Sequence, residues 1–272
     1  TELDKTHEKL STGLRINHSG DDASGLSVSE HMRSQVKGLN RASLNTQDGI
    51  SLIETAEGYL SNISSLLQRI RELSVQSANG IYSNEDRLHI QIEVSTLIDE
   101  IDKVASHAQF KGMDILNGKF SNAIEGEQLF GSIWFHIGSN MNQREKVFIN
   151  TSNSKALGLR DFFSNEILSI SSINNANYAI SKIDDALSNI NRQRGNLGAY
   201  HNRLFYTVKG LMISSENVQK AESVIRDSDM AKEVVEYFKN FILTTSTFTL
   251  FNYDRVVKHD NLMFIMSSGK ID

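Results

Sequence analysis

The most regular hydrophobic pattern of the chain runs from residue 173 to residue 225, where positions spaced alternately by three and four residues form a heptad repeat. One column of the repeat is apolar throughout: Ala176, Ile183, Ile190, Leu197, Leu204, Leu211, Val218 and Ile225. The second column starts apolar and becomes mixed: Ile173, Ile180, Leu187, Arg194, His201, Val208, Ser215 and Glu222. A seven-residue repeat kept over this length predicts one helix, about 80 Å long, packed against partner helices.

A second long helix is predicted nearer the start of the chain. Asp21 and Asp22 suit the N-cap and first turn of a helix that begins near Ala23, because carboxylates accept hydrogen bonds from the free N–H groups there. Its apolar positions form two columns, Ile53, Ala56, Leu60, Ile63, Leu67 and Ile70 in one and Leu52, Tyr59, Leu66 and Leu73 in the other. This stripe is wider than a two-stranded contact needs, so we expect the helix to touch more than one neighbour.

Glycine and asparagine residues mark the ends of the other helices. A short helical stretch across residues 3–10 is interrupted by Gly13, and Asn79–Gly80 predicts a turn. A further helix begins at Ser83–Asn84. Its expected inward positions are Val94, Ile98, Ile101, Ala105 and Ala108.

Between residues 110 and 168 the hydrophobic period changes to two and glycines cluster. Segments 132–137 and 146–150 are predicted to be strands joined across residues 138–140, with Trp134 as a core aromatic of the hairpin. This insert is too short for a typical catalytic domain. Because helical arms remote in sequence flank it, the predicted fold is mostly α, an elongated antiparallel helical bundle or coiled coil with a small mid-chain β-hairpin region.

Composition and charge narrow the classes of function. The 272 residues include no proline, which suits long helices, and no cysteine, which excludes disulfides, thiolate metal sites and cysteine nucleophiles. The net charge of −5 argues against nucleic acid as a partner. We expect no membrane insertion, because no apolar run is long enough for a spanning helix, and residues 1–11 lack the apolar core of a Sec signal peptide.

The few candidates for chemistry have simpler explanations. His89 and Glu93 have a spacing that metal sites use, but no third ligand is apparent and an exposed polar face explains both. Asp21 and Asp22 lack the spaced oxygen ligands of a calcium loop. Acid, base and nucleophile types share one helical arm, with nothing to orient them in a pocket: His201, Ser215, Glu216 and Glu222. We therefore predict neither an enzyme nor a bound cofactor or metal.

Two polar residues in the second column of the long helix, Arg194 and His201, have two interpretations. They can fix the register of the bundle or meet a neighbouring subunit. Alternatively, the column turns toward solvent where a partner helix ends. The sequence supports both interpretations about equally.

Several motifs resemble the signatures of bacterial flagellins. The amino-terminal set comprises LSTGLRIN (10–17), GDDASGL (20–26), GLNRAS (38–43), DGIS (48–51), QRIREL (68–73) and AQFKG (108–112), and the carboxy-terminal signature is AESVIRDSDMA (221–231). They occur on both arms and in the family's order. SIWFHIG (132–138) and ASHAQF (105–110) look most like the core flagellins of spirochaete periplasmic flagella.

The resemblance implies a structural subunit that polymerises into the periplasmic flagellar filament for motility. It implies an inner-domain remnant at 1–22, a core helical domain at 23–228 with the hairpin insert near 110–168, and an inner-domain helix at 229–272. Export is expected by the flagellar type III route. The expected partners are other flagellin subunits in a homo- or heteropolymer, an export chaperone, and sheath and hook-associated proteins.

The resemblance also points to one surface. Arg69, Leu73 and Glu93 match flagellin positions recognised by the vertebrate innate flagellin receptor. In the family the same surface is buried between subunits. For a periplasmic member we favour filament packing, with receptor contact restricted to released monomer.

The chain departs from the family pattern at both ends. The resemblance leads us to expect a further helical segment ahead of residue 1, and after Leu243 an Ala- and Gln-rich helix. Instead Thr244–Thr249 lowers helix propensity, and the match ends near Asn252. A frameshifted or decayed terminus is our hypothesis. It leaves an alternative function open, that of a non-polymerising secreted helical ligand or a decayed paralogue.

Overall fold

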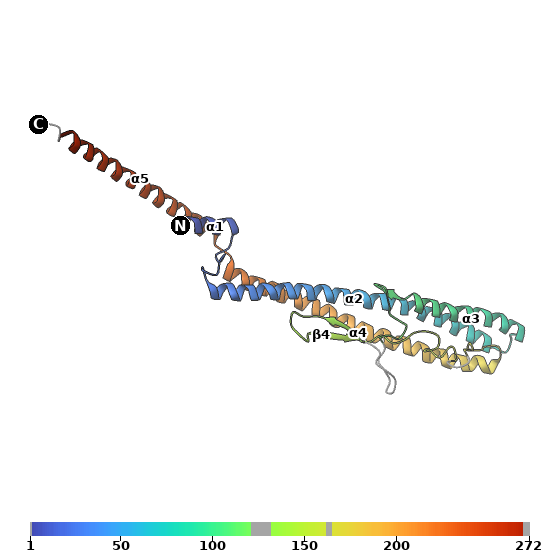
Figure 1. Cartoon of the computed structure of the whole chain (residues 1–272). Coiled ribbons are helices and arrows are strands. Elements are labelled where there is room, and N and C mark those ends of the chain that lie inside the picture. The colour runs from blue at the N-terminus through green and yellow to red at the C-terminus, as the bar shows by residue number, and fades with distance from the viewer. Residues whose placement is uncertain (1, 121–131, 162–164, 269–272) are drawn as a thin grey trace. The chain divides into compact units, whose positions relative to one another are not determined.

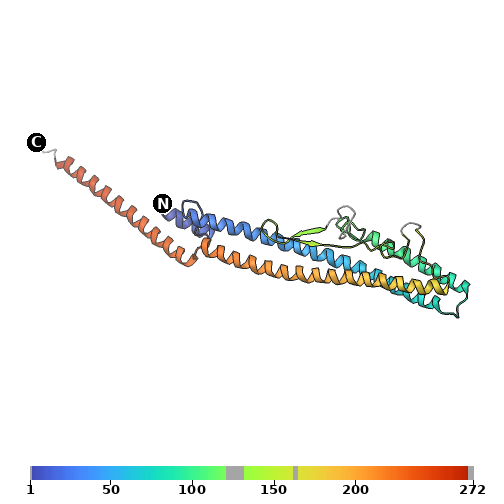
Figure 2. The same cartoon turned by 90° about the horizontal axis from the view of Figure 1, so that it is seen from below.

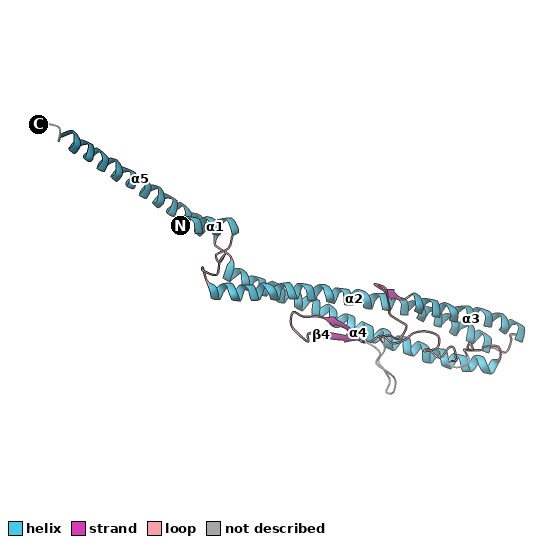
Figure 3. Cartoon of the chain, in the orientation of Figure 1, coloured by secondary structure: helices cyan, strands magenta, loops and turns pink. Residues whose placement is uncertain are grey.

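The computed structural model describes residues 2–120, 132–161 and 165–268, with side chains as far as Lys258 except that of Val256. In these ranges the chain forms five helices, α1 (Glu2–Thr12), α2 (Ala23–Ala78), α3 (Asn84–His107), α4 (Ile173–Arg226) and α5 (Met230–Ser268). Two short antiparallel pairs complete it, β1 (Gln109–Phe110) with β2 (Met113–Asp114) and β3 (Ile133–His136) with β4 (Arg144–Val147) (Figures 1 and 3). The predicted mostly helical fold with a small hairpin region is confirmed.

The chain divides into two compact units, which we describe separately. Unit 1 comprises residues 1–36 and 216–272, and unit 2 comprises residues 37–215. Since α2 and α4 each cross the division, each helix contributes to both units. The domain limits expected from the resemblance, at 22/23 and 228/229, stay predictions.

In unit 2, α2 and α4 lie side by side and antiparallel (Figures 1 and 2). Polar pairs fix their register, because each pair further toward the start of α2 meets a residue further toward the end of α4. The pairs are Arg71 with Asp184, Glu57 with Arg194, Glu54 with His201 and Asn40 with Ser215. These four side-chain pairs therefore hold α2 and α4 together, although the two helices are far apart in the sequence.

One hydrophobic cluster joins α2, α3 and α4 in unit 2. The predicted core positions of all three helices are buried in it: Ile53, Leu60, Ile63, Leu67, Ile70, Val94, Ile98, Ile101, Ile183, Ile190, Leu197 and Leu204. Leu211 is also buried, with 9% exposure. The buried positions of α2 are not all apolar, because Thr46, Ser74 and Ser77 are buried as well. Their hydroxyls bond to main-chain carbonyls, which removes the cost of burying them.

The second column predicted for α4 is wrong in its first half. Ile173 is 41% exposed, and Ile180 and Leu187 are only half-buried. The buried positions lie one residue earlier, at Ala179, Ala186 and Gln193. The small alanines allow the helices to approach closely, and the larger Ile180 and Leu187 cover the edge of the contact. Heptad spacing alone does not specify which of the two neighbouring columns is buried.

Capping side chains set the helix starts that the sequence predicted. Asp22 accepts hydrogen bonds from the Gly25 amide at 2.9 Å and the Ser24 hydroxyl at 2.8 Å, and these bonds lower the pKa of its carboxyl. Asp21 accepts from the amides of His18 and Asn17, which lowers its pKa too. Both aspartates therefore act as local hydrogen-bond acceptors at the start of α2.

A reciprocal capping box begins α3. The Asp86 amide donates to Ser83 Oγ at 3.1 Å, and the Ser83 amide and hydroxyl donate to Asp86 Oδ2 at 3.0 and 2.7 Å. The Ser83 hydroxyl is the main cause of the lowered Asp86 pKa. This box explains why the helix resumes directly after the Asn79–Gly80 turn.

The hairpin region differs from its prediction in three respects. The second strand occupies Arg144–Val147 rather than 146–150, because the connecting loop is longer and the Ile149 amide donates to the Phe120 carbonyl instead. The tight β1–β2 turn at Lys111 and Gly112, where φ is 49° and 78°, was not predicted. Trp134 is not a core aromatic, as it is 43% exposed.

The neighbouring residue, Phe135, points toward α2 instead. A Cβ on Gly49 of α2 would lie 3.1 Å from the Phe135 ring, so this glycine permits the close approach of strand and helix. Alternation along β3 was correctly predicted, but the assignment of its two faces was reversed.

The threonine-rich stretch of α5 is helical, and the helix continues to Ser268. The hydroxyls of Thr244, Thr245 and Thr247 each donate at 2.7 Å to the carbonyl four residues earlier. These bonds satisfy the side chains inside the helix, so the low propensity of the stretch does not end it here.

Candidate assembly surfaces

Helix α5 carries many exposed apolar side chains of unit 1. Its large hydrophobic side chains with at least 37% exposure are Met230, Val234, Val235, Phe238, Phe241, Ile242, Leu243, Phe248, Leu250, Phe251, Tyr253 and Val257. A shallow pocket on the same helix is lined by Leu243, Thr244, Thr247, Phe248 and Phe251. Soluble monomers rarely expose contiguous apolar surface on this scale without a partner.

Helix α1 packs against the first turns of α5. The His7 and Tyr237 rings lie 6.3 Å apart, and Lys9 Nζ is 3.6 Å from Glu233 Oε1. Tyr237 in turn stacks on Phe241 at 6.3 Å. The shorter α1 thus accounts for only part of the α5 surface.

The connectors between helices in unit 1 are bonded to each other. Gly13 accepts from the Ser228 amide at 3.0 Å, and the Arg15 amide donates to the Arg226 carbonyl at 2.7 Å. Nearby, Arg226 pairs with Glu30, and Arg33 pairs with Glu222 at 3.0 Å. These bonds join the starts of α2 and α5 to the end of α4.

The three residues of the surface expected from the resemblance lie in different surroundings. Arg69 Nη2 lies 2.7 Å from Glu93 Oε1, so α2 and α3 bring these two residues together. The hydrogen bond to Glu93 is the main reason that the Arg69 pKa is raised. Leu73, by contrast, is 3% exposed in the core, because it faces the helix bundle rather than solvent. The exposed part of this surface is therefore the Arg69–Glu93 pair.

Arg194 and His201 both find acidic partners within the chain. Arg194 Nη2 lies 3.4 Å from Glu57, and His201 Nε2 lies 3.3 Å from Glu54. About a third of the Arg194 side chain and of the His201 side chain remains exposed, at 33% and 34%. They lie at the edge of the α2–α4 contact, where they fix its register and still reach solvent.

The four residues considered for catalysis do not form a site. His201 pairs with Glu54, Ser215 donates to Asn40 at 2.8 Å, Glu216 pairs with Lys220, and Glu222 with Arg33. The side chains within the described ranges include no group of three or more His, Asp or Glu placed to hold a metal ion. No helix among the described residues has the length and hydropathy needed to cross a membrane.

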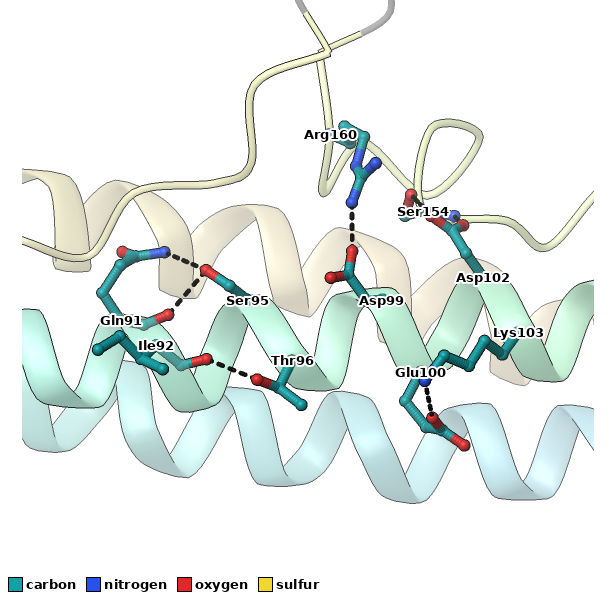
Figure 4. Close-up of polar contacts among 10 residues, drawn as sticks. All are labelled: Gln91, Ile92, Ser95, Thr96, Asp99, Glu100, Asp102, Lys103, Ser154 and Arg160. Atoms are coloured by element: carbon teal, nitrogen blue, oxygen red, sulfur yellow. Dashed lines mark hydrogen bonds and ion pairs between the residues drawn. The ribbon is translucent and has the colours of Figure 1, made fainter.

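Sequence reasoning did not identify the polar contacts that fasten the segment after β4 to α3. Asp102 accepts from the amide and the hydroxyl of Ser154 at 2.8 and 2.7 Å, and Asp99 pairs with Arg160 at 2.6 Å (Figure 4). Neither aspartate belongs to a motif, and their partners lie more than fifty residues away. Such pairings carry no local signal.

The helices, the exposed surface and the polar pairs together define a class of protein. Long heptad helices, an exposed apolar helix and dispersed polar pairs suit a structural subunit that associates through helices. A model of the bacterial flagellin N-terminal helical region matches residues 1–121, and one of the flagellin C-terminal helical region matches residues 180–252.

Individual relatives agree with the two family models. The chain is 57% identical over 244 residues to the flagellar filament 33 kDa core protein of Treponema phagedenis, covering 90% of this chain and 85% of that protein. It is 52% identical over 249 residues to the flagellar filament core protein flaB2 of Brachyspira hyodysenteriae, covering 92% and 87%. The crystal structure of Bacillus cereus flagellin matches with a TM-score of 0.51 and 27% identity, over 62% of this chain and 88% of that one.

The chain belongs to the bacterial flagellin family and is a structural subunit of the flagellar filament type. The predicted family is thereby confirmed, including its likeness to the spirochaete filament core proteins. The alternative of a decayed or non-polymerising paralogue is not favoured, since the similarity extends over most of the chain.

Proposed function

We propose that the chain polymerises with other flagellin subunits through the apolar surface of α5, as part of a periplasmic filament that drives motility. The observation that carries this proposal is the set of exposed apolar side chains from Met230 to Val257 on one helix. Each apolar Å² that assembly removes from water contributes about 25 cal/mol. Repeated along a helical lattice of non-closing contacts, this burial favours a polymer over a closed oligomer.

Negative-stain microscopy of the purified chain tests the proposal. We expect filaments to appear above a threshold concentration, with their yield increased by short filament fragments added as seeds. A chain that stays monomeric at high concentration, even with seeds, would contradict the proposed polymerisation.

We also propose finer assignments of location and partners. The likeness to Treponema and Brachyspira core proteins supports a periplasmic filament, export by the flagellar type III route, and contacts with an export chaperone and with sheath and hook-associated proteins. No enzymatic step is proposed. Cell fractionation tests the location: the chain should accompany flagella in the periplasmic fraction and be retained in the cytoplasm when the flagellar export apparatus is inactivated.

For the Arg69–Glu93 pair we propose a filament-packing role rather than a primary receptor role. Both side chains are about half exposed, at 51% and 45%, so a neighbouring subunit can reach them. Arg69→Glu should reduce filament yield, and the double variant Arg69→Glu/Glu93→Arg should restore part of it by re-forming the pair. Unchanged yield in both variants, together with lost activation of the innate receptor by monomer, would favour the receptor role instead.

A further inference from the structure

The outer face of the β3–β4 hairpin carries four exposed side chains that are aromatic or basic. Trp134 and His136 lie on β3, and Arg144 and Lys146 lie opposite them on β4. Trp134 faces Lys146 and His136 faces Arg144 in the antiparallel register. We call these four residues the hairpin patch. It combines aromatic and basic side chains on a chain whose net charge is −5.

The two cations of the hairpin patch are held over the indole ring. The guanidinium carbon of Arg144 lies 4.1 Å from the Trp134 ring centroid, and Lys146 Nζ lies 4.4 Å from it. Among the residues that the structure describes, neither cation forms an ion pair with a carboxylate. The ring therefore orders two positive charges whose side chains have no carboxylate partner within the described ranges.

The hairpin is fixed from its other face, so the hairpin patch is pre-organised. Phe135 packs on α2 at Gly49, and Glu145 forms an ion pair with Arg203 of α4. Asn45 of α2 donates from Nδ2 to the His136 carbonyl at 3.3 Å. These contacts hold β3 and β4 against two helices and direct the patch away from them.

We propose that the hairpin patch is a docking surface for an acidic segment of another protein, independent of polymerisation through α5. Ordered cations on a rigid strand pair fit carboxylates, which accept charge-assisted hydrogen bonds from Arg and Lys. A sugar would stack on the indole, where it would compete with the two cations already held over the ring. Contacts between copies of this chain are better served by the apolar α5 surface, because the patch offers little apolar area to bury.

Trp134 makes the proposal measurable, because it is the sole tryptophan of the chain. Titration of the full chain with poly-L-glutamate should change Trp134 fluorescence in a saturable manner, with an effect that weakens as salt rises. In Arg144→Gln/Lys146→Gln the half-saturating concentration should rise about tenfold, since two charge-assisted contacts are lost. The matched control Lys182→Gln/Arg192→Gln removes the same charge from α4 and should change that concentration by less than about twofold.

Two further titrations test the other possible ligands of the hairpin patch, a second copy of the chain and a sugar. A Trp134→Phe chain, silent in this assay, serves as a second copy, and a chito-oligosaccharide serves as the sugar. A larger response to either one than to poly-L-glutamate would overturn the proposal, as would an equal loss of binding in the two double variants or no response at all. Phe248→Asp, which alters only α5, should leave the response intact, so failure of polymerisation is distinguishable from failure of docking. Circular dichroism confirms that each variant is folded.

Discussion

Single side chains decide where the helices of this chain begin. Asp22 and Ser83 stand directly before α2 and α3, and each accepts a hydrogen bond from an amide that has no partner inside its helix. Both helix starts were predicted, and at Asp22 the capping role was predicted as well, because a carboxylate before an apolar stripe is a local signal. The distant pairs, such as Asp102 with Ser154, were not predicted, since no local pattern encodes them.

Ser83→Ala should destabilise unit 2 by about 1 kcal/mol, because the Asp86 amide at the start of α3 loses its acceptor. Urea unfolding followed by circular dichroism measures this as a lower midpoint with an unchanged slope. Ser83→Asp keeps an acceptor and should retain most of the stability. Equal losses in the two variants would show that the cap does not hold the helix start.

The caps also predict how stability depends on pH. Hydrogen bonds lower the folded-state pKa values of Asp22 and Asp86 below the ordinary value of 3.8. Their contribution is therefore complete above that value and is lost as pH falls through the folded-state pKa. The variant Asp22→Asn keeps an N-cap acceptor without a titrating group. Unfolding midpoints measured from pH 6 down to about pH 2 should fall less steeply for it than for the wild type. Parallel curves would contradict this assignment.

At the scale of elements, hydrophobic periodicity predicted the helices well, and it was least informative where two faces compete. Heptad spacing located α4, but not which of two adjacent columns is buried beside Ala176 and Ile183. Alternation located β3, but not which of Trp134 and Phe135 faces the helices. Arg144 and Lys146 on the partner strand were the available signal, because two cations opposite a ring indicate the solvent side.

Core positions of α2 should be far more sensitive to truncation than exposed ones. Ile63 is fully buried, with 0% exposure, whereas Val75 on the same helix is 49% exposed. Ile63→Ala should lower the free energy of unfolding by about 2–5 kcal/mol through lost burial and a residual cavity. Val75→Ala should stay within about 0.5 kcal/mol of the wild type. Chemical denaturation of both variants measures the difference, and comparable losses would contradict the assigned core.

At the scale of the whole molecule, the proposed function depends on apolar side chains that remain exposed after folding. Unit 2 buries one apolar cluster among α2, α3 and α4, whereas α5 of unit 1 exposes large apolar side chains along its described length. The sequence identified the family through its motifs. After Leu243 its two signals conflicted, because the resemblance implied a helix to residue 272 whereas Thr244–Thr249 indicated low helix propensity. The stretch is helical, and its threonine hydroxyls bond to main-chain carbonyls.

The central claim is that polymerisation depends on the apolar surface of α5. The direct test is the mass of polymer recovered by ultracentrifugation from equal concentrations of wild type, Phe248→Asp and Ser246→Asp. Phe248 is 69% exposed and Ser246 is also exposed, so neither change disrupts a packed core. Phe248→Asp should abolish pelleting, because it places a charge in the surface that assembly buries, whereas Ser246→Asp, on the other side of the helix from Phe248, should retain most of it. Wild-type yield from Phe248→Asp, or equal loss in both variants, would contradict assembly through this surface.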